Sequence, residues 1–457
     1  MTKTLESRQF EYAGRRFAYN PATMLAEVWG DTGPRSFQDP IIQEPVFSIG
    51  RRRGVNFITL NVAHDCNMAC PYCFAKQGMY GGPRQLMSGA VAYKAVDWLL
   101  DSAGDQRHVY LRFLGGEPLL NIPTIESTID YAKGRAAEAG KEVHFSINTN
   151  GTIFNDKIER LLRENAMTIS VSIDGDKEAH DAYRVFRNGR GTFDVAMKTL
   201  PRLIECDPLT MVNATVTSAA LDLYRYAMLY RENGVRLVRF AMVGTSEKNM
   251  CVTTPEQVRR LTGQYDLLAR RYLDDLRAGD YWYLSDFYKY LDNLQYRQAR
   301  VSRCGAGTSY VNIDVNGAIH LCHRFTADKS QQVGTVHEKG IGELKPAAGR
   351  TFAGEDAWVT SIDHRRLDGE LLGHDGRNAG VCTQCDIHSL CGGYCFHDSA
   401  MLFGSTQHGP DVAKCEVDRH LAKVAMWLLS ELHDRDDQAL DAIRDLHVHS
   451  IQHVKGD

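Results

Sequence analysis

The sequence predicts an α/β protein built on a partial (β/α)6 barrel of the TIM type, followed by a smaller cysteine-rich domain. Short apolar runs alternate with segments of helical period between residues 56 and 250, as in the repeated strand–helix units of a parallel sheet. Six units fit the count, so the barrel is expected to be incomplete and open on one side. Seven of the twelve cysteines lie beyond residue 300, outside this alternation, and they define the second domain.

The composition excludes several classes of protein. A chain of 457 residues can bury a large core and is not a small disulfide-stapled scaffold. The net charge of −4 gives no basic excess for binding nucleic acid. The N-terminus lacks a secretory signal and no run reaches about 18 apolar residues, which predicts a cytoplasmic protein without membrane contacts. In a reducing compartment, cysteines serve as metal ligands or catalytic groups rather than as disulfides.

Residues 1–55 are expected to form a strand-rich cap on the barrel or a truncated peptide-recognition element. The run QFEYAGRRFAYN predicts a pair of strands with AGRR at the turn. The segment from Phe10 to Trp29 is compatible with the addition of a peptide strand at an exposed edge.

Residues 56–250 are expected to hold the barrel. The apolar runs predict six strands, namely Phe57–Ala63, Val109–Leu114, Val143–Ile147, Thr168–Ile173, Met211–Thr217 and Leu237–Val243. The segments between them predict helices, for example Val91–Asp101, Ile122–Ala139, Asp156–Asn165 and Thr192–Cys206. The strand ends carry the unusual segments HDCNMACPYC, GGEP, NTNG, SIDG, VTSA and MVGT. Because the loops after the strands converge on one mouth of an α/β barrel, we expect the chemistry there, where an open side suits a large substrate such as a peptide.

The remaining segments complete the expected organisation. Residues 251–300 are predicted to form a helical linker, and the aromatic run YWYLSDFYKYLDNLQY is expected to pack in the core. Residues 301–420 hold the cysteine-rich domain. Residues 421–457 are assigned to a C-terminal helix, whose helical pattern begins near Val412 and continues to His449.

Three cysteines lie on the loop after the first barrel strand. Cys66, Cys70 and Cys73 in CNMACPYC can supply three thiolates to a four-iron cluster, which leaves the fourth iron open as a reaction site. Zinc is the competing interpretation. A structural zinc site needs four closed ligands, however, and His64 would complete this set awkwardly.

This Cys-x3-Cys-x2-Cys motif, with Tyr72 before the last cysteine, resembles the signature of radical S-adenosylmethionine (radical SAM) enzymes. The resemblance covers roughly residues 56–420, and further motifs fall in the family's order. It implies that the catalytic cysteines hold a cluster whose electron breaks S-adenosylmethionine into methionine and a 5′-deoxyadenosyl radical. It further implies cofactor contacts to the methionine amino group, the ribose and the carboxylate. These are, besides Tyr72, Gly115, Gly116 and Glu117 in GGEP, Asn148 and Asn150 in SINTNG, Ser172 and Asp174 in SVSIDG, and Arg184 in HDAYR.

The cysteines beyond residue 300 resemble the SPASM extension, which holds two auxiliary four-iron clusters, and this implies three clusters in all. The resemblance assigns an outer cluster to Cys382, Cys385, Cys391 and Cys415, and an inner cluster to Cys304, Cys322 and Cys395. Fully ligated relatives have a further cysteine where CGAGTSYVNID has none, so the inner cluster is expected to keep an open iron unless Cys206 or Cys251 closes it. Both of these are expected to be small structural residues.

The sequence around the first cysteine loop, GGEP and Cys322 resembles maturases that install cysteine thioethers in ranthipeptides and in the small subunit of quinohemoprotein amine dehydrogenase. The resemblance implies that a substrate thiolate binds the open iron and that its sulfur joins a carbon that has lost hydrogen. The expected partners are a cysteine-containing peptide or protein precursor and an electron donor such as flavodoxin or ferredoxin.

Several alternatives stay open. The enzyme could instead be a carbon–carbon cross-linking cyclase or an anaerobic sulfatase maturase, although sulfatase maturases have an aspartate where this chain has His323. A non-enzymatic alternative is an iron–sulfur scaffold or a zinc-binding module. The histidines near the later cysteines are expected to be hydrogen-bonded rather than bound to iron. They are His320, His323, His388 and His397.

Overall fold

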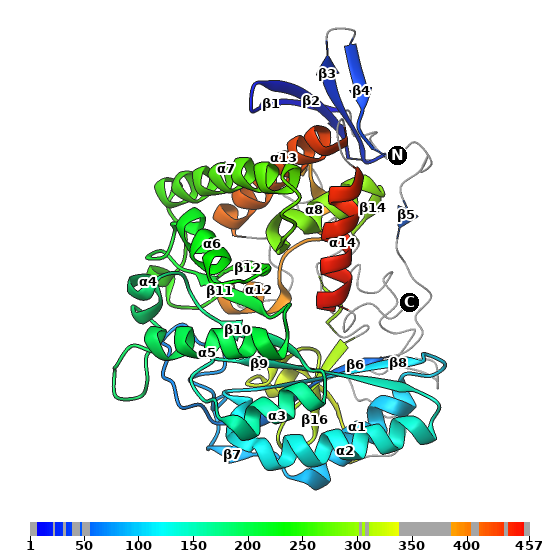
Figure 1. The fold of residues 1–457 in the computed structure, drawn as a ribbon, viewed down its shortest axis with the longest axis vertical. Helices are drawn as coiled ribbons and strands as arrows, with labels where there is room; N and C mark the ends of the chain where they lie inside the picture. The colour runs from blue at the N-terminus through cyan, green and yellow to red at the C-terminus, as the bar shows by residue number, and fades with distance from the viewer. Residues whose placement is uncertain are drawn as a thin grey trace.

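The computed structural model describes residues 7–21, 23–30, 33–38, 46–47, 55–300, 304–306, 310–337, 385–403, 411–433 and 437–451. A small N-terminal sheet lies at one end of the molecule and helices α1 to α3 lie at the other, with the main sheet between them (Figure 1). Among the described helices, none is long and apolar enough to cross a membrane.

The N-terminal sheet is antiparallel and its strands follow one another in order. They are β1 (Arg8–Tyr12), β2 (Arg15–Asn20), β3 (Leu25–Gly30) and β4 (Gly33–Ser36). Ala13 and Gly14 form the first turn with φ values of 49° and 76°, as a two-residue hairpin requires. The expected strand pair is therefore confirmed, with Arg15 and Arg16 in β2 rather than in the turn. The Tyr12 hydroxyl donates to Asp266 Oδ1 at 2.5 Å, which ties this sheet to helix α7 (Pro255–Arg277).

The main sheet confirms all six predicted strands, with ends shifted by at most two residues. These strands lie side by side and parallel in chain order. They are β6 (Phe57–His64), β8 (His108–Gly115), β9 (Glu142–Thr149), β10 (Thr168–Ser172), β11 (Met211–Val216) and β12 (Leu237–Met242). Their buried apolar side chains form the main core.

Further short strands extend the main sheet at both edges, which the sequence did not predict. The strand β15 (Tyr310–Ile313) runs parallel to β6, and β16 (Ala318–His320) and β17 (Gln332–Thr335) continue from it antiparallel. At the other edge β13 (Tyr283–Leu284) pairs with β12. These pairings satisfy edge N–H and C=O groups, and they bring the segment that carries Cys322 beside β6. The remaining short pairs are β7 (Gln85–Leu86) on β6 and β5 (Val46–Phe47) with β14 (Gln298–Ala299).

The four helices predicted between the strands are confirmed. They are α1 (Gly89–Ser102), α2 (Ile122–Glu138), α3 (Asp156–Glu164) and α5 (Phe193–Cys206), and the structure adds α4 (Lys177–Asp181) and α6 (Leu223–Glu232). Side-chain caps fix two of the starts: Ser88 accepts a hydrogen bond from the Val91 amide, and Asn155 accepts one from the Ile158 amide. Single 3-10 turns complete this region at Pro118–Asn121 and Lys248–Met250.

The segment after β12 is helical, as expected, and most of its aromatic residues are buried. Helix α7 begins with a capping box between Thr254 and Gln257, and α8 (Ser285–Gln295) follows it. Trp282 is fully buried and its indole donates to Asp275 Oδ2 at 3.1 Å. The prediction that this aromatic run packs in the core is therefore confirmed.

The C-terminal part is helical, but it contains two helices where one was predicted. They are α13 (Val412–His433) and α14 (Asp437–Ile451), and α13 packs against α7 and α8. The cysteine-rich region adds α11 (His388–Cys391), α12 (Phe396–Phe403) and 3-10 turns at His323–Phe325 and Lys329–Gln331.

Candidate active site

The first three cysteines share one loop at the carboxyl end of β6. Cys66 and Cys70 are each 9% exposed and Cys73 is partly exposed. Local hydrogen bonds shape the loop: the Met68 amide donates to Cys66 Sγ at 3.4 Å, and the Cys73 amide donates to the Cys70 carbonyl at 3.2 Å. Burial raises the pKa of Cys66 to about 12, and the nearby Cys70 and Cys73 thiols act in the same direction. The structure thus gathers the three predicted thiols beside one another.

The segment after α4 holds this loop in place. The Arg187 guanidinium lies 2.5 Å from Asp65 Oδ1 and also donates to the Cys66 carbonyl. The Ala69 amide donates to the Val185 carbonyl at 2.8 Å. Arg187 was not among the predicted site residues, because its partner Asp65 lies 122 residues earlier in the chain.

The glycines of GGEP allow two chain segments to approach closely. A Cβ atom on Gly115 would lie 2.4 Å from the Ala63 carbonyl oxygen, and one on Gly116 would lie 2.2 Å from the Asp65 carbonyl oxygen. The Gly116 amide donates to that Ala63 carbonyl at 2.8 Å. Gly78 has a φ of +87°, and a Cβ there would lie 2.6 Å from Cys66 Cβ. Only glycine fits these positions without moving the cysteine loop.

The carboxylate of Glu117, just after the carboxyl end of β8, is fully buried. It accepts hydrogen bonds from the Asn150 amide at 2.8 Å, Thr149 Oγ1 at 2.9 Å and the Leu119 amide at 3.1 Å. Burial raises its pKa to about 7 despite these bonds. Among the described residues no cationic side chain pairs with Glu117. A buried carboxylate in this state suits an incoming ammonium group, such as the amino group of S-adenosylmethionine.

Asn150 links Glu117 to the cysteine loop. Its side-chain amide donates to Asn67 Oδ1 at 3.0 Å and points at Cys66 Sγ at 3.7 Å. Asn67 in turn donates to Thr152 Oγ1 at 2.8 Å. Asn67 was not among the predicted site residues, although it lies within the cysteine motif.

Three further predicted residues form a buried network. Arg184 Nε lies 2.8 Å from Asp174 Oδ2, Tyr72 also donates to that carboxylate, and the Thr215 amide donates to Asp174 Oδ1 at 2.7 Å. The Arg184 guanidinium lies 5.6 Å from the centre of the Tyr72 ring. The network therefore joins the cysteine loop to β10 and β11, and Asp174 directs its oxygens to protein groups.

Two predicted cofactor contacts lie on the main-sheet strands β9 and β10. Asn148 is on β9 and Ser172 is on β10, and both are partly buried. Asn148 pairs with Ser170 across the two strands, two residues before Ser172. The hydrogen bonds found at the cysteine loop involve Asn150 rather than either of these residues.

The three cysteines assigned to the inner auxiliary cluster also come together. Burial raises the pKa of Cys322 to about 12, and the neighbouring Cys395 and Cys304 thiols add to this effect. The Arg324 amide donates to Cys322 Sγ at 3.3 Å and its guanidinium donates to Cys395 Sγ at 3.7 Å. Arg324 was not among the predicted site residues. Its position two residues after Cys322, a proposed ligand, is a pattern that could have pointed to it.

The outer set is described in part. Cys382 lies outside the described residues. The pKa of Arg419 is raised: burial alone would lower it, but the nearby Cys385, Asp386 and Cys415 have a larger effect in the opposite direction. The Cys385 and Cys415 thiols therefore both lie near the Arg419 guanidinium. Cys391 directs its thiol to the Gly393 carbonyl at 3.3 Å.

The two remaining cysteines contact backbone carbonyls. The Cys251 thiol is buried and donates to the Thr245 carbonyl at 3.6 Å, while the Cys206 thiol points at the Glu159 carbonyl at 4.0 Å. These contacts agree with the structural role expected for both residues.

The four histidines near the later cysteines have hydrogen-bond partners in the protein. These pairs are His320 Nε2 with Asp314 Oδ2 at 3.3 Å, His323 Nδ1 with the Tyr310 hydroxyl at 2.5 Å, His388 Nδ1 with the Cys385 carbonyl at 3.0 Å, and His397 Nδ1 with Asp398 Oδ1 at 3.5 Å. The expectation of hydrogen-bonded histidines is therefore confirmed.

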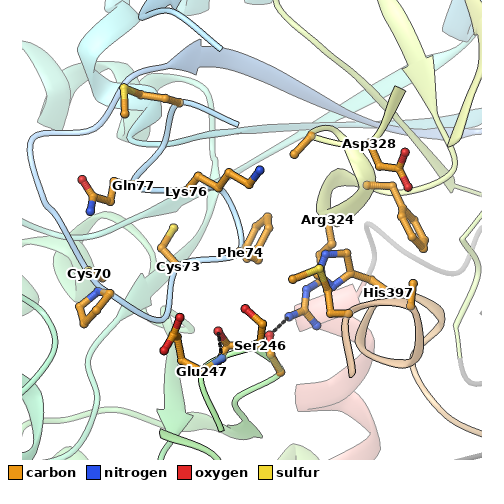
Figure 2. A pocket seen from close by; sticks show the side chains of 18 of the residues that line it. Cys70, Cys73, Phe74, Lys76, Gln77, Ser246, Glu247, Arg324, Asp328 and His397 are labelled. Atoms are coloured by element: carbon orange, nitrogen blue, oxygen red, sulfur yellow. Dashed lines mark hydrogen bonds between the residues drawn. The ribbon is translucent and has the colours of Figure 1, made fainter. Parts of the chain in front are cut away.

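A cavity of about 840 Å³ separates the two cysteine regions. Figure 2 shows Cys70 and Cys73 on one side of it and Arg324 and His397 on the other. The Arg324 guanidinium is fixed by Asp398 at 2.6 Å and by the Gly244 carbonyl at 3.2 Å. The first cysteine loop and the region around Cys322 and Cys395 thus face one space large enough for part of a peptide.

Comparison with known proteins agrees with this geometry. Residues 60–216 match the family model described as the Radical SAM superfamily, so the parallel sheet and the three-cysteine loop define a radical SAM domain. The resemblance to radical SAM enzymes is confirmed for this domain.

Particular relatives extend the likeness beyond that domain. The chain is 22% identical over 357 residues to the cysteine-type anaerobic sulfatase-maturating enzyme of Clostridium novyi, covering 75% of this chain and 88% of that protein. A solved structure of anSMEcpe with bound AdoMet matches with a TM-score of 0.69 at 17% identity, covering 86% of this chain and 99% of that one. Streptococcus suis SuiB bound to the precursor peptide SuiA matches with a TM-score of 0.52 at 15% identity, covering 79% and 76%. The two structures establish a shared fold.

Proposed function

We propose that this chain is a radical SAM maturase that forms a cysteine thioether in a ribosomally made peptide or protein. The observation that carries the proposal is the single cavity bounded by Cys70 and Cys73 on one side and by Arg324 and His397 on the other. An enzyme that abstracts hydrogen at one centre and handles sulfur at another needs both centres open to the same substrate.

The residues present fit the cofactors that this proposal requires. Cys66, Cys70 and Cys73 would hold the catalytic [4Fe–4S] cluster, and Glu117, a buried carboxylate with no cationic partner among the described residues, would accept the amino group of S-adenosylmethionine. When bound, these groups supply a 5′-deoxyadenosyl radical that removes a hydrogen atom from carbon. In the proposed arrangement Asn150 orients the cofactor beside Cys66, and the Asp174–Arg184–Tyr72 network keeps the cysteine loop rigid.

The cysteine region beyond residue 300 is proposed to be a SPASM domain with two auxiliary clusters. Its cysteines offer seven thiolates for eight iron positions, so a cluster held by the inner set would keep one iron open to a substrate thiolate. Arg324 beside Cys322 and Cys395 supplies positive charge where such a thiolate would bind. A thioether forms when a carbon loses one hydrogen atom and the thiol loses a proton, which leaves one surplus electron; a cluster held by Cys304, Cys322 and Cys395 would accept that electron.

The partners follow from the same proposal. The substrate is a cysteine-containing precursor, in keeping with relatives named for sulfatase maturation and for binding a precursor peptide. An electron donor of the flavodoxin or ferredoxin type would reduce the first cluster. The N-terminal sheet is proposed as a cap or recognition element, because it packs on α7 and is distinct from the barrel strands.

A second candidate function is sulfatase maturation. It is favoured by the alignment with a cysteine-type sulfatase-maturating enzyme over most of the chain. Against it, the residue after Cys322 is His323, whose burial and cationic neighbours hold its pKa well below the usual range and whose ring is bonded to Tyr310. A neutral imidazole that is already hydrogen-bonded to Tyr310 is a poor substitute for the aspartate that sulfatase maturases have at this position. Carbon–carbon cross-linking remains a third outcome.

Mass spectrometry of the product separates these functions. We would reconstitute the enzyme anaerobically and incubate it with S-adenosylmethionine, a reductant and the short cysteine-containing peptide encoded nearest to its gene. A thioether appears as the loss of two hydrogens with a cysteine that no longer reacts with iodoacetamide. A loss of two hydrogens with an alkylatable cysteine indicates carbon–carbon cross-linking, and an aldehyde at the cysteine position indicates sulfatase-type maturation.

Metal analysis tests the non-enzymatic alternative. Three four-iron clusters correspond to about twelve iron and twelve sulfide ions per chain. Zinc without iron, or iron without 5′-deoxyadenosine formation under reductant, would contradict the enzyme proposal.

A further inference from the structure

A group of metal-ligating side chains lies at the opposite edge of the main sheet from the cysteines. His108 begins strand β8, and Glu142 and His144 stand at the start of β9. Asn150, which contacts the first cysteine loop, lies six residues beyond His144, a path of about 20 Å along an extended chain. This group is therefore separate from the candidate active site.

The three ligand atoms are spaced as a metal ion requires. One nitrogen from each histidine and one carboxylate oxygen all lie within 4.8 Å of one another. His108 Nδ1 is 3.1 Å from His144 Nε2 and 3.4 Å from Glu142 Oε2. Zinc bonds of 2.0–2.1 Å at tetrahedral angles place neighbouring ligand atoms about 3.3 Å apart.

Strand pairing holds the three side chains on one face. His108 pairs with Glu142 and Tyr110 pairs with His144 in the parallel register of β8 and β9. Residues two apart on a strand share a face, so the two histidines and the glutamate point to the same side of the sheet. The Tyr110 ring stacks on the His144 ring at 5.0 Å with an interplanar angle of 21°, which restricts the imidazole orientation.

One oxygen of the Glu142 carboxylate is directed at the histidines. Arg107 lies 2.5 Å from Glu142 Oε1, so the second oxygen, Oε2, is left facing His108. The two imidazole nitrogens that face each other at 3.1 Å can share only one proton, whereas a metal ion would accept a lone pair from both.

We propose that His108, Glu142 and His144 form a binding site for a divalent transition-metal ion, with Zn²⁺ bound through two imidazole nitrogens and one carboxylate oxygen. Two nitrogens and one oxygen form a ligand set typical of zinc and related metals. Glu142 is exposed, so water completes the coordination. A bound ion would link the first residues of β8 and β9 and make this end of the sheet more rigid.

Zinc titration of the iron-loaded protein tests this site. The holoenzyme would be freed of loosely bound metal with a chelator and titrated anaerobically with Zn²⁺ against a competing indicator. The wild-type protein should bind one further zinc ion, and His144→Gln should weaken that binding by about a hundredfold or more. His337→Gln is the matched control, since this exposed histidine lies in the turn after β17, away from β8 and β9.

A second variant and a spectroscopic measurement distinguish a specific site from unfolding or from zinc bound by cysteines. Glu142→Gln changes an exposed side chain and should weaken zinc binding without loss of iron, which excludes unfolding as the cause. X-ray absorption at the zinc edge should report nitrogen and oxygen ligands without sulfur. Equal zinc binding by the wild-type protein and His144→Gln, or sulfur ligands at zinc, would overturn the proposal.

Discussion

Gly116 shows how a single residue controls the position of the cysteine loop. Its Cα lies against the Asp65 carbonyl and the Gly78 backbone, with 2.2 Å and 2.7 Å to a hypothetical Cβ. Gly116→Ala should therefore displace the loop, and the iron content should fall by about one four-iron cluster while the other clusters remain. Iron analysis and electron paramagnetic resonance measure this.

Gly134→Ala is the control for that substitution. A Cβ at Gly134 meets nothing within 4 Å, and alanine is favoured over glycine in a helix interior by about 1 kcal/mol. This variant should keep its iron and gain stability. Full iron content in Gly116→Ala would show that the close approach is not needed.

Glu117 provides the second prediction at the residue scale. Glu117→Gln keeps the size of the side chain but removes the charge proposed to bind the cofactor amino group. We expect roughly ten- to hundredfold weaker binding of S-adenosylmethionine, the range of a lost charged hydrogen bond. The rate of 5′-deoxyadenosine formation against cofactor concentration measures it, with iron content unchanged.

The exposed Glu138 is the matched control, since Glu138→Gln removes a carboxylate on the outer surface of α2. An unaltered cofactor dependence in Glu117→Gln would remove the assigned role of this carboxylate.

The residue-scale predictions from sequence succeeded where a motif is contiguous. Cys66, Cys70 and Cys73 fall within eight positions, and the structure places their thiols together. Arg187 was missed because its contact with Asp65 spans 122 residues and depends on how two loops fold over each other. No local pattern in the sequence encodes such a contact.

Among the elements, the short helix α4 carries a histidine that couples stability to pH. His180 is 1% exposed, accepts a hydrogen bond from the Asp174 amide at 3.1 Å and contacts Thr192 Oγ1 at 2.9 Å. Burial lowers its pKa to about 4, assisted by Arg184. Between pH 6.5 and 4 the unfolded chain therefore binds a proton that the folded chain does not, and stability falls as the pH falls.

His180→Gln should reduce this pH dependence. In the wild-type protein, this histidine lowers the free energy of unfolding by about 1.4 kcal/mol for each pH unit below 6.5. Between pH 6.5 and 5 the free energy of unfolding of the variant should therefore fall by about 2 kcal/mol less than that of the wild type. Thermal or urea unfolding of the holoenzyme at both pH values measures the difference. His433→Gln, on the exposed end of α13, is the control and should keep the wild-type dependence of the free energy of unfolding on pH. The same dependence in His180→Gln would show that burial does not shift the pKa of His180.

At the element scale the periodicity of apolar residues predicted the strands and four helices well, because each is an unbroken pattern in a buried position. The strand β15 was not predicted, since four residues between cysteine-rich loops carry too weak a pattern. Only its pairing with β6, Tyr310 opposite Phe57, makes it a strand. Tertiary hydrogen bonding decided its structure.

For the whole molecule, the main consequence of β15 is that the region around Cys322 lies beside β6. The sequence predicted two separate cysteine regions but not their distance. The structure places the first loop and Arg324, which contacts Cys322 and Cys395, around one cavity. Tyr80 lies near Cys66, Cys73 and Cys322. This arrangement leads us to assign cofactor cleavage to one region and sulfur chemistry to the other.

The measurement that tests this division most directly compares 5′-deoxyadenosine with cross-linked product in Cys322→Ala. Cys322 lies in the second region and Cys73 in the first. We expect Cys322→Ala to form 5′-deoxyadenosine with no thioether product, and Cys73→Ala to form neither. A wild-type yield of thioether product from Cys322→Ala would contradict the account.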